Sequence, residues 1–420
     1  MPATTVSAPP YAILELPSGL RVIHQPVAHT KVSHCGFLFD TGSRDEAPDQ
    51  LGLAHFWEHM AFKGTRKRRA WHILNRLETV GGELNAYTTK EKISFHASVL
   101  SQHFERALEL LSDITFHSTF PEREIEKERG VILEEMAMYL DAPDDAIADE
   151  FDALTFPHGH PLGTNILGSR ESVSGFRQAD FRRFVEQQTS PAQGVFASVS
   201  NLPTKTVFRL AEKYLGELPA RPGRPARVAP TSYQPTWRTE EKPVQQAHCV
   251  IGAPAYALHD PRRVALFLLT NVLGGPGANS RLNLAVREKY GLVYAIDAQY
   301  TGFQDTGQLS IYFGTEKRQL ARTVGLVKKE LKKLRDTALT TTQLHTAKAQ
   351  LMGQLAMAEE STSGLMSLLG RSLLDLGRVE SLEEVFGQIR RITAKELLEI
   401  ANEVLAEERL SGLMFVPEGR

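Results

Sequence analysis

The chain has 420 residues, of which 42% are hydrophobic and 23% are charged, a balance typical of a folded globular protein rather than a disordered one. A chain of this length exceeds one ordinary hydrophobic core, so two or more domains are expected. The net charge of −2 gives no electrostatic reason to expect nucleic acid or an anionic membrane surface as a partner.

Cysteine usage and the start of the chain bear on the cellular compartment. The two cysteines, Cys35 and Cys249, lie in apolar stretches that predict strands, so we expect buried free thiols and no disulfide framework. Residues 1–10 lack the basic start and apolar core of a secretory signal. No apolar run approaches the ~18 residues that indicate a membrane span. These features predict a cytoplasmic protein with no membrane partner.

The first half of the chain mixes strand and helix patterns. Residues 11–16 and 20–24 flank Ser18-Gly19 and predict a hairpin. Further strands are predicted at 32–40, 93–99 and 194–200. Helices are predicted at 51–62, 71–80, 102–117, 122–139 and 204–214.

A proline-rich stretch follows, in which prolines interrupt every helix or strand pattern between residues 218 and 244. We predict a first domain at 1–218, a semi-rigid linker at 219–243 and a second domain at 244–420. Strands of the second domain are predicted at 249–252, 293–299, 308–313 and 410–416. Its helices are predicted at 261–272, at 281–288 and between 318 and about 405.

The two halves show a weak internal duplication. Residues 77–100 can be laid over residues 284–313, because both read as a helix end, a glycine, a strand, a turn and a strand. The predicted fold is therefore α+β, with two similar domains, each a mainly antiparallel sheet with helices packed on one face.

The most informative segment is His55-Phe56-Trp57-Glu58-His59, inside the helical run LGLAHFWEHMAF. Residues four apart share one face of a helix, so His55 and His59 can present two imidazoles to one metal ion. Glu58 lies on the adjoining edge of that face, where a carboxylate can act as a general base without being a ligand. The order H-x-x-E-H is an inverzincin signature, and a catalytic zinc usually needs a third protein ligand.

Candidates for the third ligand lie in the predicted helix 122–139. Glu128 and Glu135 are two turns apart on nearly one face, whereas Glu134 points about a quarter-turn away. Helical glutamates are usually just a solvated surface, so the residues alone do not decide among these carboxylates.

Several segments together resemble one protein family. HFWEHMAFKGT, VGGELNAYTTKEKISFHASV and EIEKERGVILEEMAMY are similar to the pitrilysin/insulinase family of metallopeptidases, most of all to the branch that includes mitochondrial processing peptidase and its bacterial relatives. The resemblance continues through HPLGTNILGSRESV and SRLNLAVREKYGLVYAI, so it spans nearly the whole chain.

This resemblance assigns roles to individual residues. It implies one zinc ion (Zn2+) per chain, held by His55, His59 and Glu135, with Glu128 as a supporting glutamate. Arg287 and Tyr294 match the family's arginine–tyrosine pair, which would stabilise the negative charge on the carbonyl oxygen during amide cleavage. The segment Asn85, Ala86, Tyr87, Thr88 matches the edge strand on which a substrate peptide would add as an extra strand.

The resemblance also implies an activity, a zinc-dependent endopeptidase that cleaves unfolded or extended peptides in an enclosed chamber. Family members of this length assemble four like domains from two chains. We therefore expect a homodimer with two active sites, although a heterodimer with a related chain stays open. Two other functions also stay open. The first is a non-catalytic scaffold or the regulatory subunit of a heterodimeric peptidase, and the second is a specific peptide-binding or peptide-maturation protein.

Other conspicuous residues receive structural interpretations. Phe56 and Trp57 are expected in the core, although the family more often has a smaller aliphatic residue where Trp57 stands. His158 and His160 lie among prolines and glycines with no third ligand nearby, so a metal role is rejected. The segment 274–277, Gly-Gly-Pro-Gly, resembles a phosphate loop only superficially, because the Lys-Ser/Thr pair is missing.

Overall fold

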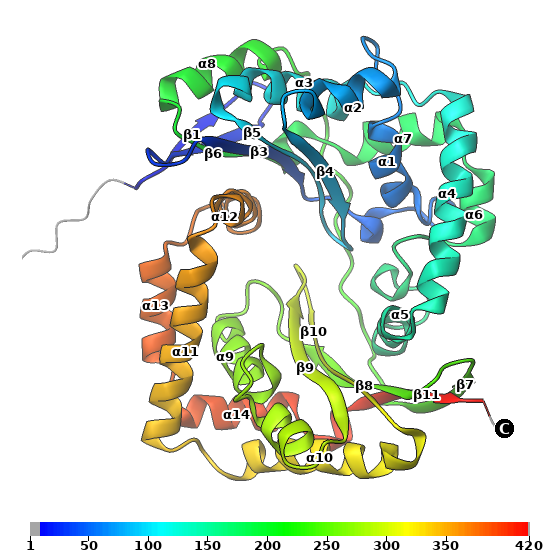
Figure 1. Cartoon of the computed structure of the whole chain (residues 1–420), viewed down its shortest axis with the longest axis vertical. Coiled ribbons are helices and arrows are strands. Elements are labelled where there is room, and N and C mark those ends of the chain that lie inside the picture. Colours follow the sequence, from blue (N-terminus) through cyan, green and yellow to red (C-terminus); the bar gives the residue numbers. More distant parts are fainter. Residues whose placement is uncertain (1–8, 419–420) are drawn as a thin grey trace, which may run out of the picture. The chain divides into compact units, whose positions relative to one another are not determined.

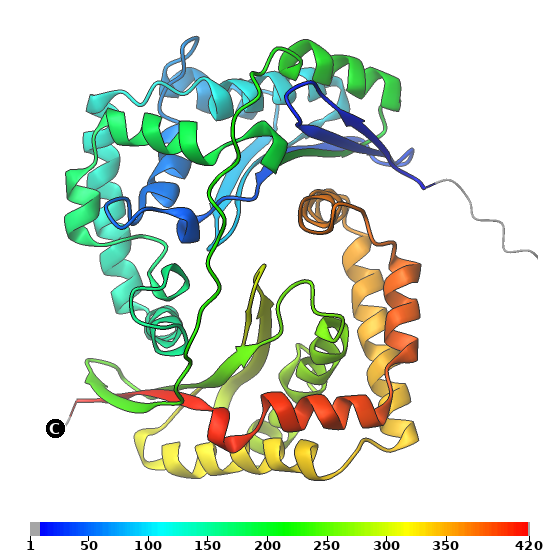
Figure 2. The same ribbon diagram turned by 180° about the vertical axis from the view of Figure 1, so that it is seen from behind.

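The computed structural model describes residues 9–418, and Figures 1 and 2 show its ribbon from two sides. The chain divides into two compact units, each made of three segments. Within the described residues, unit 1 consists of 9–134, 165–226 and 358–379, and unit 2 consists of 135–164, 227–357 and 380–418.

Unit 1 is built on a six-stranded sheet with the strand order β1-β2-β6-β3-β5-β4. All neighbouring strands are antiparallel except β2 and β6, which are parallel. The strands are β1 (Ala12–Glu15), β2 (Arg21–Pro26), β3 (Val32–Phe39), β4 (Glu83–Thr88), β5 (Ile93–Leu100) and β6 (Gly194–Ser200). Strand β6 is buried along its whole length, as expected of a central strand that is covered on both faces.

Helices cover both faces of this sheet. α3 (Phe104–Phe116) and α8 (Thr204–Leu215) lie on one face, and α12 (Thr362–Leu376) lies on the other (Figures 1 and 2). The α12 face is an apolar layer in which Leu365, Leu369 and Leu373 pack against Ile23 and Val195. The remaining helices of this half are α1 (Leu53–Ala61), α2 (Ala70–Glu78), α4 (Glu122–Asp141), α6 (Arg170–Gly175) and α7 (Gln178–Gln188).

Unit 2 repeats the same strand order without the extra first strand. Its five-stranded sheet runs β7-β11-β8-β10-β9, and only β7 and β11 are parallel. The strands are β7 (Trp237–Lys242), β8 (Ala247–Ala255), β9 (Val293–Gly302), β10 (Gly307–Thr315) and β11 (Ser411–Pro417). β2 of unit 1 and β7 of unit 2 therefore occupy matching places, because each pairs in parallel with the last strand of its sheet, and the hairpins β4–β5 and β9–β10 form matching edges of the two sheets.

The second sheet is also covered on both faces. α5 (Pro143–Thr155) covers one face (Figure 1). Its residues Ile147 and Phe151 form an apolar cluster with Val250, Leu413 and Phe415. The other face meets the main core of the unit, which includes α9 and α14. The helices of this half are α9 (Arg263–Gly274), the π-helix η5 (Asn283–Glu288), α10 (Leu320–Asp336), α11 (Thr341–Glu359), α13 (Leu382–Arg391) and α14 (Ala394–Val404).

The predicted fold class is confirmed, because two similar α+β units with mainly antiparallel sheets are present. One detail of the linker prediction is wrong. Residues 237–242 form strand β7, which pairs with β11, since an edge strand can form from a polar segment that shows no hydrophobic alternation. The compact units also exchange two helices relative to the sequence halves, as α5 belongs to unit 2 and α12 to unit 1. Among residues 9–418, no helix combines the length and the apolarity that crossing a membrane requires.

Candidate metal centre

Helix α1 carries the H-x-x-E-H segment, and its start is fixed by backbone geometry. Gly52 is the N-cap residue, with a φ of 93° that favours glycine. A Cβ at this position would lie 2.3 Å from the carbonyl oxygen of Leu167, so the close approach of the two backbones also requires glycine. Phe56 and Trp57 are fully buried, which confirms their predicted core role, and Trp57 packs edge-on against Phe95 with ring centroids 5.1 Å apart. The apolar side of α1 is therefore anchored in the core of unit 1.

A buried glutamate that sequence reasoning missed completes the helix start. The two carboxylate oxygens of Glu46 accept hydrogen bonds from the backbone N–H groups of Gly52 at 2.8 Å and Ala54 at 2.7 Å. Glu46 is only 6% exposed, and burial raises its pKa to about 8, although the two backbone hydrogen bonds act in the opposite direction. This carboxyl group serves as the cap that Gly52 itself cannot provide, because glycine has no side chain.

His55, His59 and Glu135 come together as one group. One nitrogen of each imidazole and one carboxylate oxygen of Glu135 all lie within 4.8 Å of one another. The two imidazole rings are 4.8 Å apart between centroids, as expected one turn apart on α1. Two atoms bound to the same zinc ion at about 2 Å each cannot be more than about 4 Å apart, so only a small closing movement would bring the three donors onto one ion. Two imidazoles and one carboxylate are a ligand set of catalytic zinc sites.

The electrostatics of the group suit metal binding. Burial, with a smaller contribution from the neighbouring His59, lowers the pKa of His55 to about 3. An imidazole with such a pKa is neutral at physiological pH and has a lone pair ready to donate to a metal ion. No proton therefore has to leave His55 when a metal binds near pH 7.

Glu128 lies behind the second histidine. Its Oε2 is 3.2 Å from Nδ1 of His59, and its Oε1 is 2.6 Å from Nζ of Lys63. Burial would raise the pKa of Glu128, but the contacts with His59 and Lys63 outweigh this effect and lower the pKa. An ionised carboxylate on one ring nitrogen orients the imidazole and leaves its other nitrogen for a metal. From the sequence, Lys63 was interpreted only as part of a solvated basic cluster at a helix start, because its contact with Glu128 depends on the fold.

Glu58 is oriented by the neighbouring edge strand. The Thr88 hydroxyl donates a hydrogen bond of 2.7 Å to Oε2 of Glu58. Thr88 is the last residue of β4, which pairs only with β5 and so forms one edge of the described sheet. Residues 85–88 thus lie on an edge strand, as the sequence indicated, and the Thr88 side chain also reaches the predicted base.

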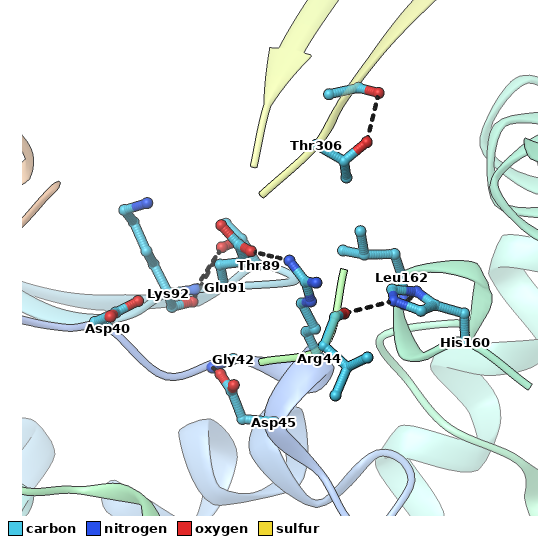
Figure 3. Close-up of polar contacts among 12 residues, drawn as sticks. Asp40, Gly42, Arg44, Asp45, Thr89, Glu91, Lys92, His160, Leu162 and Thr306 are labelled. Carbon is cyan, nitrogen blue, oxygen red and sulfur yellow. Dashed lines mark hydrogen bonds and ion pairs between the residues drawn. The ribbon is translucent and has the colours of Figure 1, made fainter. Parts of the chain in front are cut away.

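A buried polar network holds this edge strand to the start of α1. The segment before Glu46 is bound to the β4–β5 turn by two backbone hydrogen bonds, from Ser43 N to Thr89 O and from Arg44 N to Lys90 O. Nη1 of Arg44 lies 2.5 Å from Oε1 of Glu91, and both side chains are buried (Figure 3). Helix α1 and the edge strand are therefore tied together by contacts between residues far apart in sequence.

Arg287 and Tyr294 lie together in unit 2. The guanidinium carbon of Arg287, on η5, is 5.7 Å from the ring centroid of Tyr294, at the start of β9. Tyr294 is 89% exposed, so its phenol is available to a substrate or to another chain. β9 is the edge strand of the second sheet and corresponds to β4 of the first.

His160, Cys35 and Cys249, which also stood out in the sequence, lie outside the metal-binding group. Among residues 9–418, the group of His55, His59 and Glu135 is the only one of three or more acidic, histidine or cysteine side chains with metal-binding geometry. His160 instead makes loop hydrogen bonds, accepting from the N–H of Leu162 at 3.2 Å and lying 3.0 Å from the carbonyl of Val228 (Figure 3). Cys35 and Cys249 are buried free thiols, as predicted, and burial raises the pKa of both.

Known protein families and individual proteins resemble this chain over most of its length. Residues 21–170 match the model of the insulinase family (peptidase family M16), and residues 176–351 match the model of the peptidase M16 inactive domain. An uncharacterised zinc protease of Bacillus subtilis is 32% identical over 391 residues, which cover 93% of this chain and 95% of that protein. The chain belongs to the insulinase family of peptidases.

Other relatives agree with this membership. An uncharacterised zinc protease of Streptomyces coelicolor is 34% identical and covers 93% of this chain and 86% of its own length. The crystal structure of a protease from Helicobacter pylori superimposes with a TM-score of 0.89 at 22% identity, over 98% of this chain and 100% of that chain. A structure from Pseudomonas fluorescens described as a peptidase M16 inactive domain gives a TM-score of 0.90 at 20% identity, over 97% and 98% of the two chains. These two structural likenesses show the shared fold.

Proposed function

We propose that this M16 family member is a zinc-dependent endopeptidase that cleaves unfolded or extended peptides. The observation that carries the proposal is the convergence of His55, His59 and Glu135, whose donor atoms all lie within 4.8 Å of one another. The zinc-protease names of the relatives support the choice of metal. One zinc ion per chain would be held by these three residues.

Bound zinc would polarise the scissile carbonyl group and lower the pKa of a water molecule. The chain's own residues would handle the protons. Glu58 would accept a proton from the attacking water as the new C–O bond forms, and would deliver it to the leaving amine as the C–N bond breaks. The Thr88 hydroxyl, 2.7 Å from Oε2 of Glu58, would hold that carboxylate in place. Glu128 would keep the His59 ring in the orientation for binding.

Substrate binding would use the edge strand. Because β4 has a strand partner on one side only, an extended peptide can pair with its free backbone groups at residues 85–88. Such pairing makes little demand on the peptide's sequence and favours chains that are not folded. Arg287 and Tyr294 would stabilise the oxyanion through a cation and a phenol donor. We propose that they come from the second subunit of a homodimer whose chamber encloses two such sites.

One matched pair of variants tests the metal site, and a third variant tests the chemistry separately. Glu135→Gln should lose stoichiometric zinc, whereas Glu134→Gln, one residue earlier with an exposed side chain, should keep it. Glu58→Gln should keep zinc but lose cleavage of a disordered peptide by about a hundredfold or more. Zinc content by atomic emission and peptide cleavage by mass spectrometry are the measurements. Full zinc content in Glu135→Gln would contradict the ligand assignment.

A mixing experiment tests the shared active site. Glu58→Gln and Arg287→Ala are each expected to be inactive, and a mixture under subunit-exchange conditions should recover activity. In a homodimer with shared sites, one of the two sites in a mixed dimer carries neither substitution. A mixture that exchanges subunits but stays inactive would contradict sharing between chains.

A non-catalytic scaffold or regulatory subunit is the second candidate, and the inactive-domain model that matches residues 176–351 favours it. That model covers neither α1 nor α4, so it bears directly on the half that carries Arg287 and Tyr294. A chain that binds zinc stoichiometrically but cleaves none of a broad library of unstructured peptides would support this alternative. A narrow cleavage profile in the same library would point to a specific peptide-maturation protein.

A further inference from the structure

Unit 2 contains a cavity that the proposed peptidase chemistry does not use. Its volume is about 270 Å³, and it lies between the end of α9, the turn that follows and the first turns of α11. The turn contains Gly275, Pro276 and Gly277 and leads into Ser280 and Arg281. All of the lining residues belong to unit 2, so the cavity is complete within one compact unit.

Arg281 gives the cavity its charge. Its side chain is partly buried, and within residues 9–418 it has no hydrogen-bond or ion-pair partner. The charge that acts on it is that of Glu330, whose Oε1 is 2.6 Å from Nζ of Lys333. A partly desolvated guanidinium without a carboxylate partner is costly unless an anion satisfies it. A free cation in a cavity therefore points to an anionic ligand.

Uncharged residues with hydroxyl groups also line the cavity. Ser280 is 5% exposed, and its Oγ has no hydrogen-bond partner among the described residues. Thr342 and Thr346 bring two hydroxyl groups from the first turns of α11. Arginine and hydroxyl-bearing residues thus line the same cavity.

The rest of the lining excludes a metal ion and favours a partly apolar molecule. Among the described residues that line the cavity, none is aspartate, glutamate, histidine or cysteine, so a cation would find no strong ligand. Val272, Leu339 and Ala347 supply an apolar wall. A single guanidinium matches one carboxylate as a bidentate pair, whereas a phosphate dianion would need more positive charge.

We propose that this cavity binds a small organic carboxylate with an apolar body, the carboxylate on Arg281 and the body against Val272, Leu339 and Ala347. The volume of about 270 Å³ is just below the roughly 300–1,000 Å³ of sites for drug-sized ligands, which suits a fragment-sized acid. The site does not depend on the zinc chemistry and would be present in Glu58→Gln as well.

The test is isothermal titration of the full-length protein with 3-phenylpropanoate, which has both features. The neutral 3-phenylpropanamide tests the charge, and inorganic phosphate tests a bare anion. We expect 3-phenylpropanoate to bind with a submillimolar Kd and at least tenfold more tightly than either control. Arg281→Gln should weaken it by about ten- to a hundredfold, as expected for losing hydrogen bonds to a charged group. Arg318→Gln, an arginine of the same unit with an 80% exposed side chain, should bind as the wild type does.

A second variant keeps the proposal testable if Arg281→Gln folds poorly. Thr346 is exposed on α11, so Thr346→Phe should fold normally and fill the cavity, and binding should be lost. Three results would each overturn the proposal: no binding of 3-phenylpropanoate, equal binding of the amide or of phosphate, or unchanged binding in both variants. Replacing an arginine that stabilises the fold would lower the thermal midpoint. Because Arg281 has no partner among the described residues, the thermal midpoint of Arg281→Gln should equal or exceed that of the wild type.

Discussion

The cap that Glu46 places on helix α1 leads to a prediction about both stability and zinc binding. Glu46→Ala removes the acceptor of two backbone N–H groups, those of Gly52 and Ala54, which are 2.8 and 2.7 Å from the carboxylate oxygens. Alanine leaves a space in which both donors are buried without their acceptor. His55 follows Ala54 directly, so fraying of the first turn of α1 would also displace a proposed zinc ligand.

The size of the effect follows from these contacts. Leaving one buried donor without an acceptor costs about 1–3 kcal/mol, and loss of an N-cap costs about 0.5–2 kcal/mol. Water entering the space would recover part of this, so we expect unit 1 to be destabilised by about 2–4 kcal/mol. At about 2–4 °C per kcal/mol for a domain of this size, the thermal midpoint should fall by roughly 4–16 °C.

Differential scanning calorimetry and a competitive zinc chelator would measure the two consequences. Glu46→Gln retains one acceptor oxygen and should lie between Glu46→Ala and the wild type in both assays. Glu217→Ala, an exposed glutamate of the same unit, is the matched control and should change neither. A Glu46→Ala protein with a wild-type midpoint and wild-type zinc affinity would refute the capping role.

Two further predictions concern buried polar contacts. His24 is fully buried, and its Nδ1 is 2.9 Å from Ser198 Oγ. Burial lowers the pKa of His24 below its ordinary value of about 6.5. As pH falls below that value, the unfolded chain takes up a proton before the folded chain does, so stability is lost. The fall in thermal midpoint from pH 7.5 to 5.5 should therefore be smaller in His24→Gln than in the wild type. Substitution of the exposed His29 should leave this fall unchanged. An equal fall in all three proteins would contradict the interpretation. Glu128→Gln should weaken zinc binding by about ten- to a hundredfold, because His59 would be less well oriented. Glu126→Gln is the control, since Glu126 is 69% exposed on the same helix, and it should not weaken zinc binding. Unchanged zinc affinity in Glu128→Gln would remove Glu128 from the proposed site.

Periodic patterns predicted much of the fold. The hairpin around Ser18-Gly19 forms as β1 and β2, and the predicted helix at 122–139 forms as α4. The duplication suggested by residues 77–100 and 284–313 corresponds to the hairpins β4–β5 and β9–β10, which occupy the same places in the two strand orders. These elements were predictable because their apolar residues recur with the period of the structure they form.

Elements that depend on distant partners were not predictable in this way. Strand β7 has the sequence WRTEEK, which carries no strand periodicity, and forms because β11 offers it a parallel edge. Helix α5 was not predicted because Ile147 and Phe151 give only a sparse apolar stripe, and its partners Val250 and Phe415 come much later in the chain.

The same distinction between local patterns and distant contacts applies to the residues of the candidate site. His55, Glu58 and His59 could be found from one turn of helix, since their chemistry and spacing are local. Glu135 was open to choice among several glutamates until the family resemblance selected it. Glu46 and Lys63 left no signal in a single sequence, because a carboxylate that caps a distant backbone and an amine that holds a second carboxylate look like ordinary surface charges until the chain folds.

The exchange of α5 and α12 has a consequence for how the protein matures. During synthesis, all strands of the first sheet have been made once β6 leaves the ribosome. The apolar surface of Ile23 and Val195 is covered only when α12 has been made, much later in synthesis. Until then this surface is open to water and to other nascent chains, a situation in which chaperones commonly bind. A fragment that stops after β6 should therefore aggregate when expressed alone, and supplying α12 as a separate peptide should lessen the aggregation.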